Sequence, residues 1–304
     1  MGKEYTLSQQ YGIVGLDGLD CVHGSMAKRA ALRGLAAAAL LEKLLFTDET
    51  DGERDLVKLE AGLSAGLEEV RHIKKKTAKM LEKEMANLLQ ADGVMEIVPD
   101  LLGSDLDYET AGIDLKVYRS DNNAWLSVTE SIRGEILEEG PVTLECVSLL
   151  WLFRENGCIH EIFSVREQQQ IQSRMQELSL SDSLYGIIWK QEFHKGLELG
   201  AKAFLRGKRK LFQNPYLEGV NLLFPFLDRR QSIFMEQVIA GTSVEQRREA
   251  VKTTLLQKGH CVEAIKNGTE TLLQIDNMYY RIWPKTITVG RVPVQGVSLM
   301  PVYR

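Results

Sequence analysis

The strongest constraint on the fold is a run of small and aliphatic residues at helical spacing between residues 26 and 46. One face of this segment carries Ala30, Gly34, Ala37, Leu41 and Leu44. Spacings of three and four residues predict a helix, and its small side chains allow a second helix to approach closely. A preceding helix meets this need, because Thr6 and Gln9 have the spacing of a capping box and the segment ends near Gly18. The sequence therefore predicts a helical core that begins with two packed helices, 7–16 and 26–45.

A single arginine, Arg33, lies in the second of these helices among alanine, glycine and leucine. A guanidinium held in such surroundings needs an anionic partner, which either the protein or a ligand can supply. Arg33 is therefore a candidate ligand-binding residue; the alternative is a structural pair with a carboxylate of the protein such as Glu42 or Glu245.

The middle of the chain mixes helical and extended patterns. A highly charged helix is predicted from 67 to 91, and its lysines are offset by glutamates, which is typical of a solvated helix rather than of a polyanion-binding arm. Segments 113–119 and 124–128 flank a polar tetrapeptide, 120–123, and are predicted to form a hairpin. We predict that residues 47–128 are an insertion, with this charged helix and hairpin, in one mainly helical domain that spans residues 1–304.

Further helices are expected beyond this insertion. The patterns predict helices at 129–139, 142–155 and 164–178, and a mostly helical region over 183–241. A helix is also predicted at 244–258, where Thr242 and Glu245 have the spacing of a capping box.

The last forty-five residues alternate in the manner of strands. Segments 261–266, 269–275 and 278–283 are separated by Asn267-Gly268 and Asp276-Asn277, pairs that favour type I′ turns. Residues 260–304 are therefore predicted to form an antiparallel β-meander and an extended tail. The expected fold class is mainly α: a helical domain with a small hairpin in the middle and a C-terminal antiparallel β-meander.

The composition limits the classes of function. A net charge of −5 argues against polyanion binding over the whole surface, although a basic run at 206–210 with aromatic neighbours suits a phosphate-rich partner. Four cysteines in 304 residues do not make a disulfide framework. Neither a signal peptide nor a membrane-spanning segment is visible, so we expect a cytoplasmic protein.

The sequence carries no catalytic or metal-binding signature. It lacks the nucleophile-elbow, phosphate-loop and zinc-protease motifs, so an enzyme is the least favoured class. Cysteine and histidine lie close together in three places: Cys21-Val22-His23, Cys158-Ile159-His160 and His260-Cys261. Structural zinc sites, however, mostly use ligand pairs spaced by two or more residues. We expect no catalytic residue, no metal site and no cofactor.

Two stretches carry a family resemblance. The first is Thr6-Leu7…Leu16 followed by Leu32-Arg33-Gly34…Leu41-Glu42. The second is Arg248-Glu249…Lys252…Leu255…Lys258-Gly259, with Leu272 and Leu273 in the hairpin that follows. Together they span about a quarter of the chain and resemble the Golgi phosphoprotein 3-like family.

The resemblance implies a mainly helical peripheral membrane protein. Members of that family bind phosphatidylinositol 4-phosphate in a basic pocket, and a hydrophobic hairpin tip engages the bilayer. By this resemblance Arg33 and Arg248 are ligand-binding residues that share a pocket. Leu272 and Leu273 are the membrane-contact residues.

The chain also departs from the family pattern. The pocket tryptophan of the family falls on Gly24 and its other arginine falls on Glu245, which weakens a phosphate site. A competing register places the second stretch at 149–157, with 164–178 as the following helix, but has no arginine at the pocket position.

We therefore expect a non-enzymatic binding or adaptor protein that recognises an anionic, phosphoinositide-like ligand at a membrane surface, or a protein partner. The alternative is a winged-helix-like regulatory or DNA-binding protein, in which helix 244–258 places Arg247 and Arg248 near phosphates and the meander is the wing. The acidic net charge makes nucleic acid the less favoured partner.

Overall fold

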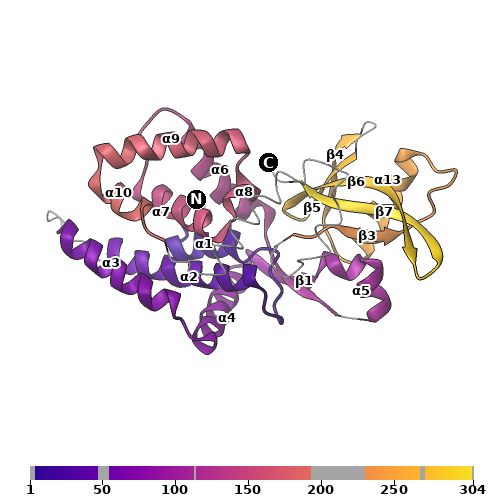
Figure 1. The fold of residues 1–304 in the computed structure, drawn as a ribbon, viewed down its shortest axis with the longest axis horizontal. Coiled ribbons are helices and arrows are strands. Elements are labelled where there is room, and N and C mark those ends of the chain that lie inside the picture. The colour runs from indigo at the N-terminus through magenta and orange to yellow at the C-terminus, as the bar shows by residue number, and fades with distance from the viewer. Residues whose placement is uncertain (1–3, 47–54, 113, 193–229, 268–270, 303–304) are drawn as a thin grey trace.

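The fold consists of a helical half and a sheet half that lie side by side along the longest axis of the molecule (Figure 1). The computed structural model describes residues 4–46, 55–112, 114–192, 230–267 and 271–302. The predicted fold class is confirmed: mainly helical, with a pair of strands in mid-chain and a C-terminal antiparallel sheet. That residues 47–128 are an insertion in one domain stays a prediction.

The helical half is built on α1 (Leu7–Gly15) and α2 (Met26–Leu45), as predicted. Its other elements are α3 (Leu56–Arg71), α4 (Lys75–Ala91), β1 (Met95–Pro99), β2 (Lys116–Ser120), α6 (Asn122–Leu137), α7 (Leu144–Asn156), α8 (Ile159–Ile162), α9 (Val165–Ser181) and α10 (Ser183–Trp189). The predicted capping box at Thr6 is present and begins α1, and a capping box at Ser164 begins α9, close to the predicted start of that helix.

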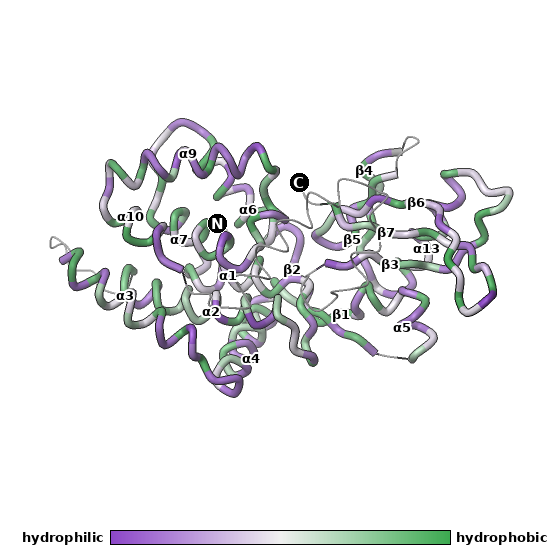
Figure 2. The backbone as a smooth tube through the Cα atoms, in the orientation of Figure 1, coloured by the Kyte–Doolittle hydropathy of each residue, from purple (hydrophilic) through white to green (hydrophobic). Residues whose placement is uncertain are grey.

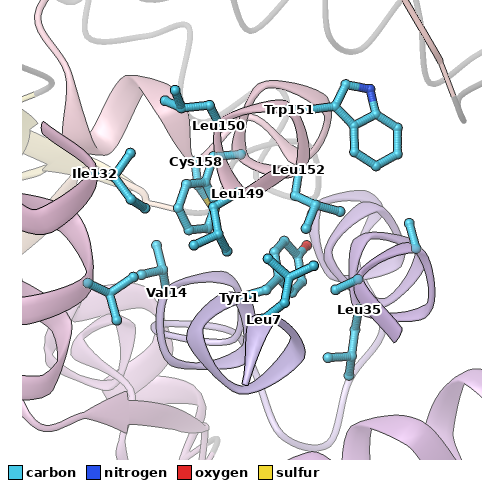
Figure 3. Packing of buried hydrophobic residues seen from close by; sticks show 14 of the residues in the cluster. Leu7, Tyr11, Val14, Leu35, Ile132, Leu149, Leu150, Trp151, Leu152 and Cys158 are labelled. Carbon is cyan, nitrogen blue, oxygen red and sulfur yellow. The ribbon is translucent and has the colours of Figure 1, made fainter. Parts of the chain in front are cut away.

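The core of this half lies between α1, α2 and α7. Residues 146–153 of α7 are all buried, as expected for a helix that is apolar on every side. Figure 3 shows side chains of α1 and α7 pointing toward one another across this core. The rings of Tyr11 and Phe153 are stacked with their centroids 6.0 Å apart.

The small-residue face of α2 serves the close approach that the sequence predicts. A Cβ atom on Gly34 would lie 2.0 Å from the Tyr11 hydroxyl oxygen. That hydroxyl donates a hydrogen bond to the Ala31 carbonyl oxygen at 2.9 Å and accepts one from the Asn156 side-chain amide at 2.7 Å. Gly34 is therefore the position at which α1 and α2 meet.

Two predictions about the middle of the chain are wrong. The charged segment 67–91 is not one helix, because α3 ends at Arg71 and α4 begins at Lys75 and turns back to pack on α1 and α2. The hairpin over 113–128 is also absent: β2 pairs antiparallel with β1, and 122–137 is helix α6. Asp121 is the helix cap rather than a turn residue, because its Oδ1 accepts a hydrogen bond from the Ala124 N–H at 3.0 Å.

The sheet half has the strand order β3-β7-β6-β5-β4. Its strands are β3 (Ile233–Glu236), β4 (Val262–Asn267), β5 (Thr271–Ile275), β6 (Met278–Val289) and β7 (Val292–Val302). One face packs on α13 (Val244–Gln257) through Val251 and Leu255, and on the short helix η1 (Leu101–Ser104) through Leu101. A further helix, α5 (Leu106–Ala111), follows η1 and contacts β3.

The predicted meander over β4, β5 and β6 is confirmed. Four other details of the C-terminal region differ from the prediction. The tail is not merely extended, because it forms β7 along the whole of β6. Residues 233–236, predicted as helical, form strand β3. The capping box of α13 uses Ser243 and Gln246, one residue later than predicted. Of the turn residues at 276–277 only Asp276 has a positive φ, 52°, so this turn is not type I′.

Strands β6 and β7 continue together beyond the rest of the sheet. Residues 284–289 of β6 pair with 292–297 of β7, whereas β5 reaches only Ile282 and β3 only Gly296. We call residues 284–295 the β6–β7 arm; it is the yellow hairpin at the right edge of Figure 1. The described part of the chain contains no helix that could cross a bilayer.

Candidate functional site

The two arginines predicted to bind a ligand lie in different halves of the molecule. Arg33 is half-buried on α2 in the helical half, between the buried residues Leu32 and Gly34. Arg248 is on α13 in the sheet half (Figure 1). The fold thus does not bring the two guanidiniums into one pocket, and a role for each in binding stays a prediction.

Arg248 is unusual in its surroundings. Its side chain is only 12% exposed, and its closest acidic group is Glu249, with Nε 3.5 Å from Oε1. Within the described residues, its buried Nε and Nη1 atoms have no hydrogen-bond partner. These two donors are covered by protein atoms, so an anionic ligand could reach them only after neighbouring side chains move.

The two positions that depart from the family pattern are both at the surface. Gly24 is exposed, and a Cβ atom there would have no neighbour within 4 Å. Glu245 is also exposed; its backbone N–H, the Ser243 hydroxyl and the charges of Arg248 and Arg247 lower its pKa. A negative charge therefore lies close to Arg247 and Arg248 at neutral pH.

The predicted membrane-contact leucines do not form an exposed tip. Leu273 is fully buried between the sheet and α13, so its assignment as a membrane contact is wrong. Leu272 is half-buried in mid-sheet, opposite Lys266 and Arg281. The turn at 268–270 lies outside the described residues.

The exposed apolar tip of the sheet half is instead at the end of the β6–β7 arm. Val289 and Val292 are 47% and 63% exposed, and Gly290 and Arg291 form the turn between them. Val238, in the neighbouring loop, is 71% exposed. This loop is attached to the arm: the Gln295 side chain accepts hydrogen bonds from the backbone N–H groups of Ile239 and Ala240, both at 3.3 Å.

The charge distribution of the sequence, rather than its hydrophobic pattern, indicates this surface. Residues 277–304 carry four cations and no Asp or Glu, in a chain whose net charge is −5. The cations are Arg281, Lys285, Arg291 and Arg304. An acid-free segment that ends in exposed valines combines positive charge with apolar surface.

A buried polar network joins the two halves. Asp17 accepts hydrogen bonds from the Ser120 N–H at 2.9 Å, the Asn277 amide at 3.0 Å and Arg230 at 2.7 Å. Burial opposes the charge of Arg230, but Glu161 and Asp17 raise its pKa above the ordinary value. A Cβ atom at Gly18 would lie 1.7 Å from the Arg230 Nη1 atom, so this contact requires glycine.

A second group of the same network centres on Asp276. Arg119 of β2 donates to its Oδ1 at 2.9 Å, and the ring of buried His260 lies 2.8 Å from its Oδ2. Burial alone would raise the pKa of Asp276, but His260, the Cys261 N–H and Arg119 together lower it. The carboxylates of Asp17 and Asp276 are paired by these contacts, whereas the buried Arg230 Nε and His260 Nε2 atoms have no hydrogen-bond partner among the described residues. We assign the network to holding the halves together.

Two other candidates from the sequence are the possible metal ligands and the basic run. In the ranges that the structure describes, no three His, Cys, Asp or Glu side chains gather in a way that could hold a metal ion. This result includes the three Cys/His pairs of the sequence. The basic run at 206–210 lies outside the described residues.

No protein-family model matches the chain, and neither the curated proteins nor the solved structures include a match. The function must therefore be argued from the surface and the buried groups described above.

Proposed function

We propose that this chain is a non-enzymatic protein that binds an anionic membrane surface through the β6–β7 arm. One observation carries the proposal: Val289 and Val292 are exposed beside Arg291 at the end of a projecting, acid-free hairpin. The proposal keeps the expected type of function and assigns the contact to the arm instead of Leu272 and Leu273.

The energetics of such a tip suit reversible attachment. Removing a valine side chain from water contributes about 1.5 kcal/mol, and a cation near an anionic bilayer contributes about 1 kcal/mol. Two valines and Arg291 would thus give a contact that depends both on the apolar surface and on anionic lipid. Neither contribution alone is sufficient for stable attachment.

Arg248 is the candidate for recognition of a single headgroup. Its Nε and Nη1 atoms have no hydrogen-bond partner among the described residues but are buried, so a lipid phosphate would accept hydrogen bonds from them only after neighbouring side chains move. Because Glu245 and Glu249 lie close to it, we expect Arg248 to add modestly to binding.

The alternative function, a winged-helix-like DNA-binding protein, is not favoured by any specific observation. The segment after α13 contributes four strands to a five-stranded sheet, and α13 is packed against that sheet through Val251 and Leu255. DNA binding is therefore retained as an outcome of the test.

Vesicle co-sedimentation tests the proposal. The wild-type chain should sediment with phosphatidylcholine vesicles that contain phosphatidylserine and should not sediment with phosphatidylcholine alone. The double variant Val289→Asp/Val292→Asp should bind at least about tenfold more weakly, because it loses apolar area and adds two negative charges.

The matched control is Val57→Asp/Leu180→Asp, which makes the same change at two exposed apolar residues of the helical half, 80% and 90% exposed. This control should bind like the wild type. Failure of the wild-type chain to bind any vesicle would contradict the proposal, and salt-sensitive binding to duplex DNA instead would support the winged-helix alternative.

A further inference from the structure

The corner between α3 and α4 carries the densest positive charge among the described residues. Between residues 71 and 83 the chain has six lysines and arginines, and Glu82 is its only acidic residue. We call this segment the basic corner; it is the purple turn at the bottom of Figure 2. It belongs to the helical half, whereas the β6–β7 arm belongs to the sheet half.

The fold removes the one acidic residue from this surface. Glu82 is 4% exposed, and its Oε1 lies 2.7 Å from the buried Lys28 Nζ and accepts a hydrogen bond from the Tyr118 hydroxyl at 3.0 Å. Its charge is thus compensated inside the protein by Lys28. Glu82 therefore does not offset the lysines at the surface, whereas Glu68, Glu69 and Glu84 of the predicted segment are exposed.

The lysines of the corner are left without acidic partners. Five are exposed and form no ion pair within the described residues: Lys74, Lys75, Lys76, Lys79 and Lys83. Glu68 on α3 is paired with Arg71 at 2.7 Å and with His72 at 3.1 Å. The corner thus presents unpaired lysines at the surface, flanked by the exposed acidic residues Glu68, Glu69 and Glu84.

This arrangement costs helix stability. The lysines occupy the first turns of α4, where the helix dipole is also positive, and Lys74 at the N-cap makes no side-chain hydrogen bond. Lys75, Lys79 and Lys83 follow one another at a spacing of four residues, so they repel one another on one face. An anionic partner would relieve both effects.

The chemistry of the corner favours a lipid surface over nucleic acid or a specific peptide. Lysine presents a point charge and lacks the planar fork with which arginine recognises one phosphate or carboxylate. Residues 56–91 contain no Phe, Tyr or Trp on which a base could stack, and His72 is the one aromatic ring in that range. Met80 is 53% exposed on the same helical face as Lys76 and Lys83, so an apolar side chain lies among the cations.

We propose that the basic corner is a second contact with an anionic bilayer, and this proposal rests on the membrane-binding function proposed above. The corner acts by charge attraction, as is typical of clusters of four to eight lysines and arginines at a membrane surface. The arm adds an apolar contact from the other half of the molecule. Two weak contacts in one chain bind more tightly than either contact by itself when both reach the same bilayer.

The test compares two triple variants in vesicle co-sedimentation. Lys75→Gln/Lys76→Gln/Lys79→Gln neutralises the corner with residues of similar helix propensity. The matched control, Lys58→Gln/Lys116→Gln/Lys190→Gln, removes the same charge from exposed lysines elsewhere. With phosphatidylserine-containing vesicles at low ionic strength, the corner variant should bind roughly tenfold or more weakly and the control should bind like the wild type.

Two further readouts separate the corner from the arm. Raising the salt concentration should reduce vesicle binding by the wild type to the level of the corner variant. The arm variant Val289→Asp/Val292→Asp should still bind weakly, and this remaining binding should decrease with salt. The corner variant should also melt at the same or a higher temperature than the wild type, because it loses unfavourable charge at the start of α4.

The outcomes distinguish the two proposals. If the wild type binds and the corner variant binds equally well, the basic corner is not a membrane contact and the proposed function stands on the arm. If no vesicle is bound by the wild type, both proposals fail. Tighter, corner-dependent binding to duplex DNA or RNA than to vesicles would also overturn this inference.

Discussion

At the scale of single residues, Gly34 is the position where one added methyl group should matter most in the helical core. A Cβ atom there would lie 2.0 Å from the Tyr11 hydroxyl oxygen, and Tyr11 is fully buried. Gly34→Ala should therefore lower the free energy of unfolding by about 1–3 kcal/mol, the usual cost of overpacking. Urea unfolding followed by circular dichroism measures this change.

Gly134 on α6 is the matched control, because a Cβ atom there would meet nothing within 4 Å. Gly134→Ala should raise the free energy of unfolding by about 0.5–1 kcal/mol, since alanine is the better helix former. An equal effect of the two substitutions would show that the α1–α2 contact is looser than the structure has it.

At the scale of elements, α6 depends on a residue whose local pattern is ambiguous. Asp121 belongs to a polar tetrapeptide that resembles a hairpin turn, yet its side chain caps α6 through the Ala124 N–H. Asp121→Ala should lower the free energy of unfolding by about 1 kcal/mol. Asp121→Asn should lower it much less, because asparagine also caps helices well. A urea titration of both variants checks this, and equal losses would argue against a capping role.

At the scale of the whole molecule, Asp276 connects the sheet half to the helical half. Its pKa is lowered in the folded state, so its charge adds stability above the ordinary Asp pKa of about 4, and this stability is lost as the pH falls through the lower, folded value. Asp276→Asn should cost about 1–3 kcal/mol at neutral pH. The difference from the wild type should shrink below about pH 4, and asparagine tolerates the positive φ at this position.

Urea unfolding at several pH values measures this difference, with Asp114→Asn as the control. Asp114 is 75% exposed and paired only with Lys116 at 3.2 Å, so its loss should change stability little. A stability difference for Asp276→Asn that is constant with pH would mean that the carboxylate charge does not hold the two halves together.

The sequence by itself determined the elements whose signals are local. Helices α1, α2 and α13 and strands β4, β5 and β6 lie close to where they were predicted, because capping residues, helical spacing and two-residue turns act within a few positions. The small-residue face of α2 likewise identifies the contact at Gly34. Arg248 was singled out through the family resemblance and the winged-helix alternative, and the structure adds that two of its guanidinium nitrogen atoms are buried without a hydrogen-bond partner among the described residues.

Only the tertiary structure decided which elements pair and which side chains face water. Strand β1 pairs with β2 across sixteen or more intervening residues, and β3 pairs with β7 from opposite ends of the sheet half, so no local pattern specifies either partner. Leu273 is buried because α13 covers its face of the sheet, and Glu82 is withdrawn from the basic corner because Lys28, from another helix, lies against it. Burial depends on what the rest of the chain places over a residue, and that is why the exposed charge and the exposed valines become visible only in the folded protein.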